Sequence, residues 1–173
     1  MKSELCRAFV NLSRASIKNR SLLLDPFCGV GGILLEASSM GIRSIGIDID
    51  VKSAMGSLTN IRYFNLDQLS DVITSDSMNI AIRSESIDAI ATDPPYGRQT
   101  IPRGTSLEDL LEKFIHNSAD VLKRNRYMVF ATPIEMDSLI EEYCRNAGLK
   151  IMEKHLNFVH SSLTRVIYVV FKP

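Results

Sequence analysis

The stretch SLLLDPFCGVGGILLEASSMGIRSIGID, residues 21–48, combines two apolar runs with a glycine-rich turn and a helical segment between them. The first run ends in Asp25 and a proline, which is typical of a buried strand that stops at a turn. Residues 33–40 predict a helix that Gly41 ends, and residues 44–48 predict a second strand. A strand, a turn, a helix and another strand in this order indicate one unit of a parallel sheet.

The same alternation continues along the chain. Helices are predicted over residues 5–17, 51–61, 107–122 and 135–146, and strands over 71–74, 87–92, 127–131, 151–159 and 166–171. The last two strands have no helix between them, so we expect an antiparallel pair at the end of the chain. Near-continuous apolar strands between helices predict an α/β fold with a doubly wound, Rossmann-like sheet that is covered on both faces.

Length and composition are those of an ordinary soluble domain: 173 residues, of which 45% are hydrophobic and 23% are charged. We treat residues 1–173 as a single domain, in which residues 1–20 carry an N-terminal helix and residues 21–173 form the core. No apolar stretch approaches the roughly 20 residues that span a bilayer, and the first residues lack a secretory pattern. Three scattered cysteines give no disulfide or zinc pattern, so we expect a cytoplasmic protein without a membrane segment or a metal.

The net charge argues against strong binding of nucleic acid by this domain alone. The 20 Lys and Arg residues are balanced by 20 Asp and Glu residues, so the formal net charge is zero. Proteins that bind phosphate backbones usually show an excess of basic residues. A local basic face is compatible with these numbers, but we expect weak affinity for a polynucleotide.

The glycine-rich turn follows the first predicted strand, at the edge of the sheet where such folds bind ligands. Gly29 and Gly31 match the first positions of the dinucleotide motif GxGxxG, but Leu34 stands at the third, and no GK[ST] sequence follows. A tight turn that is not built for pyrophosphate, preceded by the carboxylate of Asp25, favours a positively charged ligand. The sulfonium and amino group of S-adenosylmethionine are such a ligand. A turn that merely requires small residues explains the glycines equally well.

Two further aspartates follow the next two predicted strands. Asp48 lies 19 residues beyond Gly29, where these folds hold a ribose diol with a carboxylate. A strand-end aspartate is more often a helix cap, but Asp50 can cap the helix that starts at residue 51. Asp76 follows the third strand and could accept a hydrogen bond from an adenine amino group. Taken alone, Asp76 is better explained by a solvated turn.

The most informative element is DPPYG, residues 93–97, directly after the fourth predicted strand. Two prolines fix the backbone and remove two amide donors, which leaves carbonyls and the Asp93 carboxylate as acceptors. Tyr96 places an aromatic ring beside them. Acceptors next to a stacking surface suit a flat ring that bears an NH2 group. A proline-rich turn with a core tyrosine is the less favoured alternative.

Together, DPFCGVG (residues 25–31) and DPPY (residues 93–96) resemble the class I methyltransferases that act on exocyclic amines of bases. The longer strings DPPYGRQT (residues 93–100) and HSSLTR (residues 160–165) resemble more closely the archaeal and eukaryotic tRNA guanine-10 N2-methyltransferase family. The resemblance extends over nearly the whole chain. It implies that the seven predicted strands form one mostly parallel sheet with an antiparallel last strand, and that the cofactor is S-adenosylmethionine.

The resemblance also implies roles for individual residues. Asp25, Gly29 and Gly31 would line the methionine part of the cofactor. Asp48 would hold its ribose and Asp76 its adenine edge. The implied cofactor contacts are, in full, Asp25, Phe27, Cys28, Gly29, Gly31, Asp48, Ile49, Asp76 and Ser77. The target base would be held by the catalytic element Asp93, Pro94, Pro95 and Tyr96.

Arg98, His160 and Arg165 are the candidate contacts to the substrate. For Arg165, a contact with an RNA phosphate and a position over the sheet are both open. No histidine is assigned as a general base, because an exocyclic amine loses its proton readily once it is alkylated.

The expected function is therefore methyl transfer from S-adenosylmethionine to the N2 amine of a guanine in tRNA. Members of this family typically carry an N-terminal THUMP-type RNA-binding region, for which this chain has no room. Either the chain is a fragment or it obtains RNA affinity from another domain or a partner subunit.

Alternatives of the same chemistry are a DNA adenine-N6 or cytosine-N4 methyltransferase and an rRNA guanine-N2 enzyme. The chain has no segment long enough for the target-recognition insertion of a DNA enzyme, which favours RNA. A non-catalytic cofactor-binding subunit is disfavoured by the intact DPPY, and a nucleotide-binding oxidoreductase by Leu34 in the glycine motif.

Overall fold

The structure, a computed structural model, describes residues 1–96, 104–161 and 163–173. The helices are α1 (Ser3–Leu12), α2 (Gly32–Ser39), α3 (Val51–Tyr63), α4 (Leu107–Val121) and α5 (Asp137–Asn146), with 3-10 turns η1 (Ser77–Asn79) and η2 (Ile134–Met136). The strands are β1 (Leu22–Asp25), β2 (Arg43–Asp48), β3 (Ser70–Thr74), β4 (Ile87–Thr92), β5 (Leu122–Pro133), β6 (Lys150–His160) and β7 (Leu163–Lys172). The alternation of strands and helices follows the prediction.

The described strands form a seven-stranded sheet in the order β3-β2-β1-β4-β5-β7-β6. Strands β1 to β5 pair in parallel, and β7 lies antiparallel between β5 and β6. The predicted doubly wound α/β sheet with an antiparallel last strand is thereby confirmed. The strand order reverses between β1 and β4, and sheets of this kind bind ligands at the carboxyl ends of the strands beside such a reversal.

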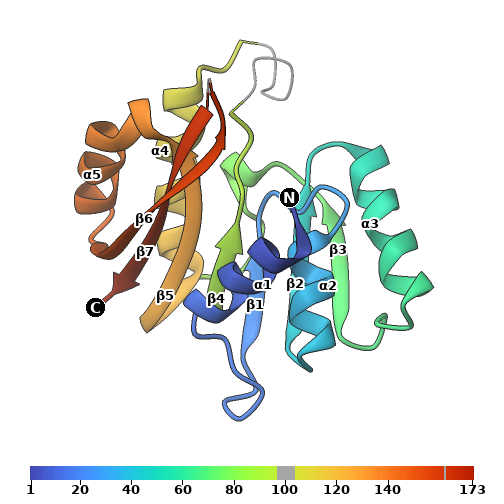
Figure 1. The fold of residues 1–173 in the computed structure, drawn as a ribbon. Helices are drawn as coiled ribbons and strands as arrows, with labels where there is room; N and C mark the ends of the chain where they lie inside the picture. The colour runs from blue at the N-terminus through green and yellow to red at the C-terminus, as the bar shows by residue number, and fades with distance from the viewer. Residues whose placement is uncertain (97–103, 162) are drawn as a thin grey trace.

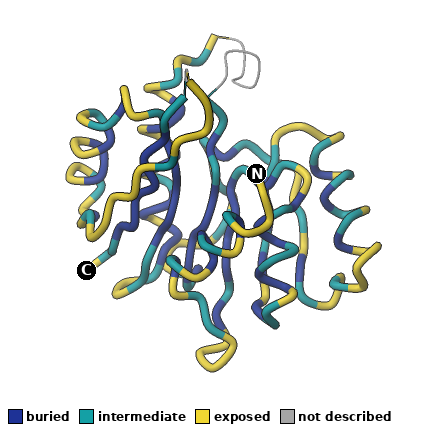
Figure 2. Tube along the Cα trace, viewed as in Figure 1, coloured by how far each residue is buried: buried dark blue, intermediate teal, exposed yellow. Residues whose placement is uncertain are grey.

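Helices cover both faces of the sheet, with α1, α2 and α3 on one side and α4 and α5 on the other (Figure 1). Each strand contributes side chains alternately to the two sides of the sheet, because successive side chains of a strand point to opposite faces. Leu23 packs with residues of α1 and α2, whereas Leu24 packs with residues of α4 and α5. In β5, Val129 likewise packs on the side of α1 and α2, and Met128 packs on the side of α4 and α5. The central strands are accordingly buried along most of their length (Figure 2).

The largest differences from the predicted boundaries are at the end of α1 and at the start of β5. Helix α1 ends at Leu12, because Arg14 has a φ of 57°, in the left-handed region that a right-handed helix does not continue through. Ile17, which the sequence pattern assigned to this helix, is instead 61% exposed. Strand β5 begins at Leu122, directly after α4, and is longer than the predicted residues 127–131.

Strand β6 forms one edge of the sheet and is exposed along most of its length (Figure 2). The strand carries four exposed large apolar side chains, those of Met152, Leu156, Phe158 and Val159.

Among the described residues, no helix combines the length and the apolar character that crossing a membrane requires.

Candidate active site

A cavity of about 530 Å³ lies at the carboxyl ends of β1, β2, β3 and β4, beside the reversal of strand order. This volume is in the range of sites for small molecules and cofactors. Its lining contains four aspartates and, among the described residues, neither Lys nor Arg: Phe27, Gly29, Asp48, Ile49, Asp50, Ser53, Asp76, Ser77, Met78, Asp93, Pro95 and Leu110. We refer to it as the acidic cavity. Its charge favours a ligand that carries positive charge.

The glycine turn after β1 forms one side of the acidic cavity. Gly29 and Gly31 have φ of 52° and 87°, in the left-handed region that glycine adopts without a steric penalty. The amide of Cys28 donates to the carbonyl of Ile47 at 2.9 Å, and the amide of Gly29 donates to Oδ2 of Asp48 at 2.9 Å. These two bonds fix the turn against the end of β2 and keep Gly29 in the wall of the cavity.

Asp48 and Asp50 have separate tasks at the end of β2. The carboxylate of Asp50 accepts from the amide and the hydroxyl of Ser53, at 2.9 Å each, and so caps α3. The hydrogen bond from the Ser53 amide is the main cause that lowers the pKa of Asp50. Asp48 is therefore not needed as the helix cap. Its carboxylate accepts from the amides of Gly29 and Asp50 and lies in the wall of the cavity.

The loop after β3 closes the far side of the acidic cavity. Oδ1 of Asp76 accepts from the amide of Met78 at 2.8 Å, which starts the turn η1. The side-chain amide of Asn117 on α4 donates to the carbonyl of Met78 at 2.7 Å and ties this loop to the helix. Asp76 and Ser77 both line the cavity, as the predicted adenine contact requires.

Three of the predicted cofactor contacts, Asp25, Cys28 and Gly31, lie behind the wall of the acidic cavity. Oδ1 of Asp25 accepts from the hydroxyl of Thr92 and the amide of Phe27, and the side chain is 2% exposed. Burial raises the pKa of Asp25 to about 7. Cys28 is 5% exposed and packs in a small apolar cluster. The lining of the acidic cavity does not include these three residues, and their contacts with the cofactor stay predictions.

The fold explains why Gly31 must lack a side chain. A Cβ atom at Gly31 would overlap the hydroxyl of Ser57 on α3, so the turn and that helix pack in direct contact. Gly31 thereby lets α3 approach the turn. It is not among the residues that line the acidic cavity, and its contact with the cofactor stays a prediction.

The first residue of the DPPY loop, Asp93, forms an ion pair with Arg165 of β7. Nη1 of Arg165 donates to the two carboxylate oxygens of Asp93, at 2.9 and 2.7 Å, and to the hydroxyl of Tyr96 at 2.9 Å. Nη2 and Nε donate to Oδ1 of Asn157 on β6, at 2.8 and 3.3 Å. Burial raises the pKa of Asp93, and the charge of Arg165 acts in the opposite direction.

A second cavity of about 640 Å³ also reaches Asp93, between the N-terminal segment with α1 and the β6–β7 hairpin. Tyr96, Asn157 and Arg165 line it, together with Met1, Lys2, Glu4, Leu5, Ala8, Phe158 and Val159. We refer to it as the second cavity. Asp93 belongs to the walls of both cavities. A carboxylate between two adjoining cavities can contact two separately bound molecules at once.

The structure places the predicted substrate contacts differently. Arg165 is 5% exposed, and its donors go to Asp93, Tyr96 and Asn157. It also lines the second cavity, and its contact with the substrate stays a prediction. His160 is the last residue of β6, at the turn into β7, and it is exposed. Arg98 lies outside the described residues.

Sequence reasoning missed several residues of the two cavities. Asn157 is the most consequential, because it holds Arg165 from the side opposite Asp93. Its position depends on the pairing of β6 with β7, which no local pattern reveals. Ser53 and Asp50 could have been found, since the first turn of a helix that follows a strand lies at the edge where ligands bind.

Within the described ranges, no group of three or more His, Cys, Asp and Glu side chains is arranged to hold a metal ion.

The strand order, with its antiparallel β7, and a ligand-sized cavity at the reversal define the class: this is a class I methyltransferase fold. TrmN from Thermus thermophilus, a solved structure, superposes over 100% of this chain and 49% of its own length, with a TM-score of 0.83 and 20% sequence identity. At this identity the likeness concerns the fold alone.

The chain belongs to the family described as RMKL-like, methyltransferase domain, which matches residues 1–167. It is 37% identical to the tRNA (guanine(10)-N2)-dimethyltransferase of Methanothermobacter thermautotrophicus, over 98% of this chain and 48% of that protein. It is 36% identical to the probable tRNA (guanine(10)-N2)-dimethyltransferase of Methanothermococcus thermolithotrophicus, over 98% of each. The chain thus spans about half the length of the first relative and nearly all of the second.

The methyl donor of this class is S-adenosylmethionine, and the acidic cavity fits it. The donor carries a sulfonium and an amino group, which match a wall with four aspartates. The apolar side chains of Phe27, Ile49, Met78 and Leu110 offer contact surface for a flat ring in the same cavity. Phe27 is held in place by Phe114 of α4, at 5.2 Å between ring centroids. S-adenosylmethionine is therefore the cofactor that both the family and the residues of the cavity support.

Proposed function

We propose that this protein transfers the methyl group of S-adenosylmethionine to the exocyclic N2 amine of a guanine in tRNA. The observation that carries the proposal is the position of Asp93, whose carboxylate belongs to the walls of both the acidic cavity and the second cavity. A methyl donor in one cavity and a base in the other would meet at this residue. The tRNA guanine-N2 names of the two relatives support the choice of base and polymer.

Within the acidic cavity, Asp48 would hold the ribose and Asp76 the adenine edge of the cofactor. The glycine turn at Gly29 would pass close to its methionine part. When bound, S-adenosylmethionine supplies a methyl group on a sulfonium, already activated for displacement. The contribution of the protein is then to position the amine and to stabilise the charge that develops on it.

The amine of guanine is a weak nucleophile because its lone pair is delocalised into the ring. In our proposal the Asp93 carboxylate and the carbonyl of Pro94 each accept one N–H of the amine. The nitrogen can then become pyramidal and direct its lone pair at the methyl group. Tyr96, in the wall of the second cavity, would stack on the base and offset part of the cost of taking it out of its stack. The amine loses a proton after alkylation, so no general base is required.

Three further expectations belong to this proposal. The continuous sheet supports residues 1–173 as one catalytic domain, and Cys6, Cys28 and Cys144, all free and buried, support a reducing cytoplasm. The balance of 20 basic and 20 acidic residues supports a need for additional RNA affinity, from another domain or a partner subunit.

A methyl-transfer assay tests the proposal. The purified chain is incubated with labelled S-adenosylmethionine and unmodified bulk tRNA, rRNA or DNA, and the modified nucleosides are identified. We expect N2-methylguanosine in tRNA. Methylated adenine or cytosine in DNA would contradict the assigned base, and N2-methylguanosine confined to rRNA would contradict the assigned polymer. Cofactor binding without transfer to any polymer would contradict catalysis by this chain alone.

A further inference from the structure

Arg165 is the residue of the site whose contacts the proposed function does not use. It comes from β7, 72 residues along the chain from Asp93, and it is 5% exposed. Its five hydrogen bonds go to three residues: Nη1 donates to Asp93 and Tyr96, and the other two nitrogens donate to Asn157. All the acceptors lie in the wall of the second cavity.

We propose, on the basis of the proposed function, that Arg165 is a positioning residue that keeps Asp93 ionised and directs its carboxylate toward the target amine, while Asn157 fixes Arg165 from the other side. Arg165 would make no ionic contact with the substrate. It would act through the protonation state and the orientation of the Asp93 carboxylate.

The geometry of the ion pair leaves Asp93 able to accept further hydrogen bonds. A single nitrogen, Nη1, donates to both carboxylate oxygens, at 2.9 and 2.7 Å. A carboxylate has about four lone-pair directions, so each oxygen keeps room for another donor. Asn157 draws the remaining donors of the guanidinium away from Asp93, at 2.8 and 3.3 Å.

The protonation state of Asp93 decides what it can do. An ionised carboxylate accepts hydrogen bonds only, whereas a protonated one also donates through its hydroxyl. A protonated Asp93 would lose acceptor capacity toward the amine. Burial favours the protonated form, and the positive charge of Arg165 opposes it. Without Arg165, nothing of comparable charge at bonding distance would offset the burial of Asp93 among the described residues.

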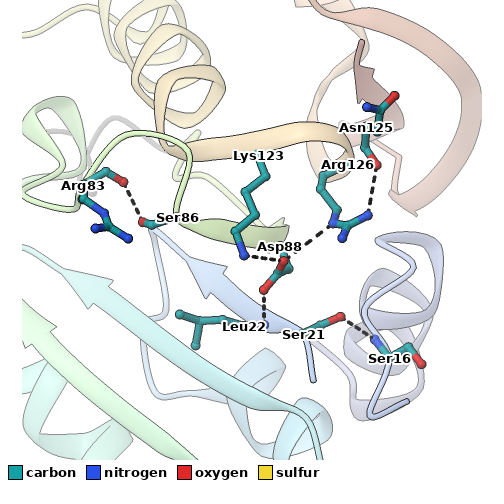
Figure 3. A network of polar contacts seen from close by, with 9 residues as sticks. All are labelled: Ser16, Ser21, Leu22, Arg83, Ser86, Asp88, Lys123, Asn125 and Arg126. Atoms are coloured by element: carbon teal, nitrogen blue, oxygen red, sulfur yellow. Dashed lines mark hydrogen bonds and ion pairs between the residues drawn. The ribbon is translucent and has the colours of Figure 1, made fainter. Parts of the chain in front are cut away.

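Asp88, near the start of β4, provides a comparison with Asp93, which directly follows the end of that strand (Figure 3). Asp88 accepts from Lys123 at 2.7 Å and from the amide of Leu22 at 3.0 Å, and it lies 3.6 Å from Nε of Arg126. Its cations come from β5 and are 41% and 42% exposed. The side chain of Arg165, the partner of Asp93, is buried instead. A buried opposite charge acts more strongly on an ionisable group than an exposed one, because water screens it less.

Several other groups face Asp93 and are common to all the variants below. They are Tyr96 in its own loop, the Met1 amino group and Cys6 from the N-terminal segment, Asp25 from β1, and Lys2 and Glu4 in the wall of the second cavity. Because these groups do not change, a difference between variants reports on Arg165.

The test compares Arg165→Gln with Arg165→Lys, which keeps the charge, and with Arg126→Gln, which alters the environment of Asp88 far from the site. The first readout is the pKa of Asp93, followed by carbon NMR of labelled carboxylates and assigned with Asp93→Asn. We expect Arg165→Gln to raise this pKa by about 1 to 3 pH units. Arg165→Lys should keep it within about one unit of the unsubstituted protein, and Arg126→Gln should not change it. An unchanged pKa in a folded Arg165→Gln protein would overturn the proposal.

The second readout is the pH dependence of kcat for methyl transfer. We expect the acidic limb of the profile to move upward in Arg165→Gln by the same interval, so that activity recovers at high pH. An equal loss at every pH would show a merely structural role and overturn the proposal. If the unsubstituted protein transfers no methyl group, the proposed function fails, and the NMR titration still decides whether Arg165 keeps Asp93 ionised. Circular dichroism of each variant establishes that it is folded. If Arg165→Gln does not fold, the pKa of Asp93 in Arg165→Lys still tests the proposal.

Discussion

The backbone amide of Gly29 donates to Oδ2 of Asp48 across 2.9 Å, and this bond joins the glycine turn after β1 to the end of β2. The second oxygen of the same carboxylate accepts from the amide of Asp50. Asp48 therefore has a defined orientation before any ligand binds. Preorganisation of this kind lowers the entropic cost of binding, because the side chain is already ordered before the ligand arrives.

Replacement of Asp48 by alanine should weaken cofactor binding. A hydrogen bond between a hydroxyl and a carboxylate contributes about 1.5–3 kcal/mol, so we expect Kd to rise about 10- to 150-fold in isothermal titration calorimetry. Asp67→Ala, at an exposed position before β3, is the control and should leave Kd unchanged. Unchanged affinity in Asp48→Ala would remove this residue from the binding site.

Replacement of Asp93 by alanine should abolish turnover while S-adenosylmethionine still binds. Removing one group that stabilises a transition state typically reduces kcat by about 10²–10³-fold. We expect the cofactor Kd, measured by calorimetry, to change by no more than about threefold, because the predicted cofactor contacts Asp48 and Asp76 are retained. Asp93→Asn keeps one acceptor oxygen and should retain more activity than the alanine variant. Turnover near that of the unsubstituted protein in Asp93→Ala would contradict the mechanism.

Gly31→Ala and Gly148→Ala form a matched pair, since the two glycines have similar positive φ of 87° and 72°. A Cβ at Gly148 meets no atom within 4 Å, so only backbone strain of about 1–2 kcal/mol applies. At Gly31 the Cβ also overlaps Ser57, which adds about 1–3 kcal/mol. Urea denaturation should therefore show the larger loss for Gly31→Ala. Equal losses would mean that α3 moves away freely, and Ser57→Ala combined with Gly31→Ala should recover part of the difference.

Asp25 should make the stability of the protein depend on pH. Burial raises its folded-state pKa from 3.8 to about 7, so the folded state holds this proton where the unfolded state has lost it. The contribution is fully present below pH 4 and is lost as the pH rises toward 7, with a slope of about 1.4 kcal/mol per pH unit. Asp25→Asn mimics the protonated form and keeps the acceptor oxygen for Thr92 and Phe27.

Denaturation midpoints from pH 4 to pH 8 measure this effect. Other ionisable groups contribute equally to both proteins, so the difference between Asp25→Asn and the unsubstituted protein isolates Asp25. The variant should gain relative stability as the pH rises through this window. A difference that stays constant across the window would show that Asp25 is ionised in the folded protein throughout.

Local patterns in the sequence were sufficient for much of the fold. The apolar runs and helix signals predict the existence and order of the helices and strands, because side-chain spacing and capping act over a few residues. Errors occurred at the boundaries, as in α1, where the left-handed conformation of Arg14 ends the helix before Ile17. No spacing rule indicates that conformation at an arginine.

The candidate site was likewise predictable from the sequence only in part. The sequence by itself determined that Gly29, Asp48, Asp76 and Asp93 follow four successive strands, and parallel strands bring their carboxyl ends to one edge of a sheet. Only the tertiary structure decided that β7 lies between β5 and β6, which brings Arg165 to Asp93 and Asn157. Pairing between strands depends on contacts over long distances in the chain, and a register shifted by one residue would turn Arg165 to the other face of the sheet.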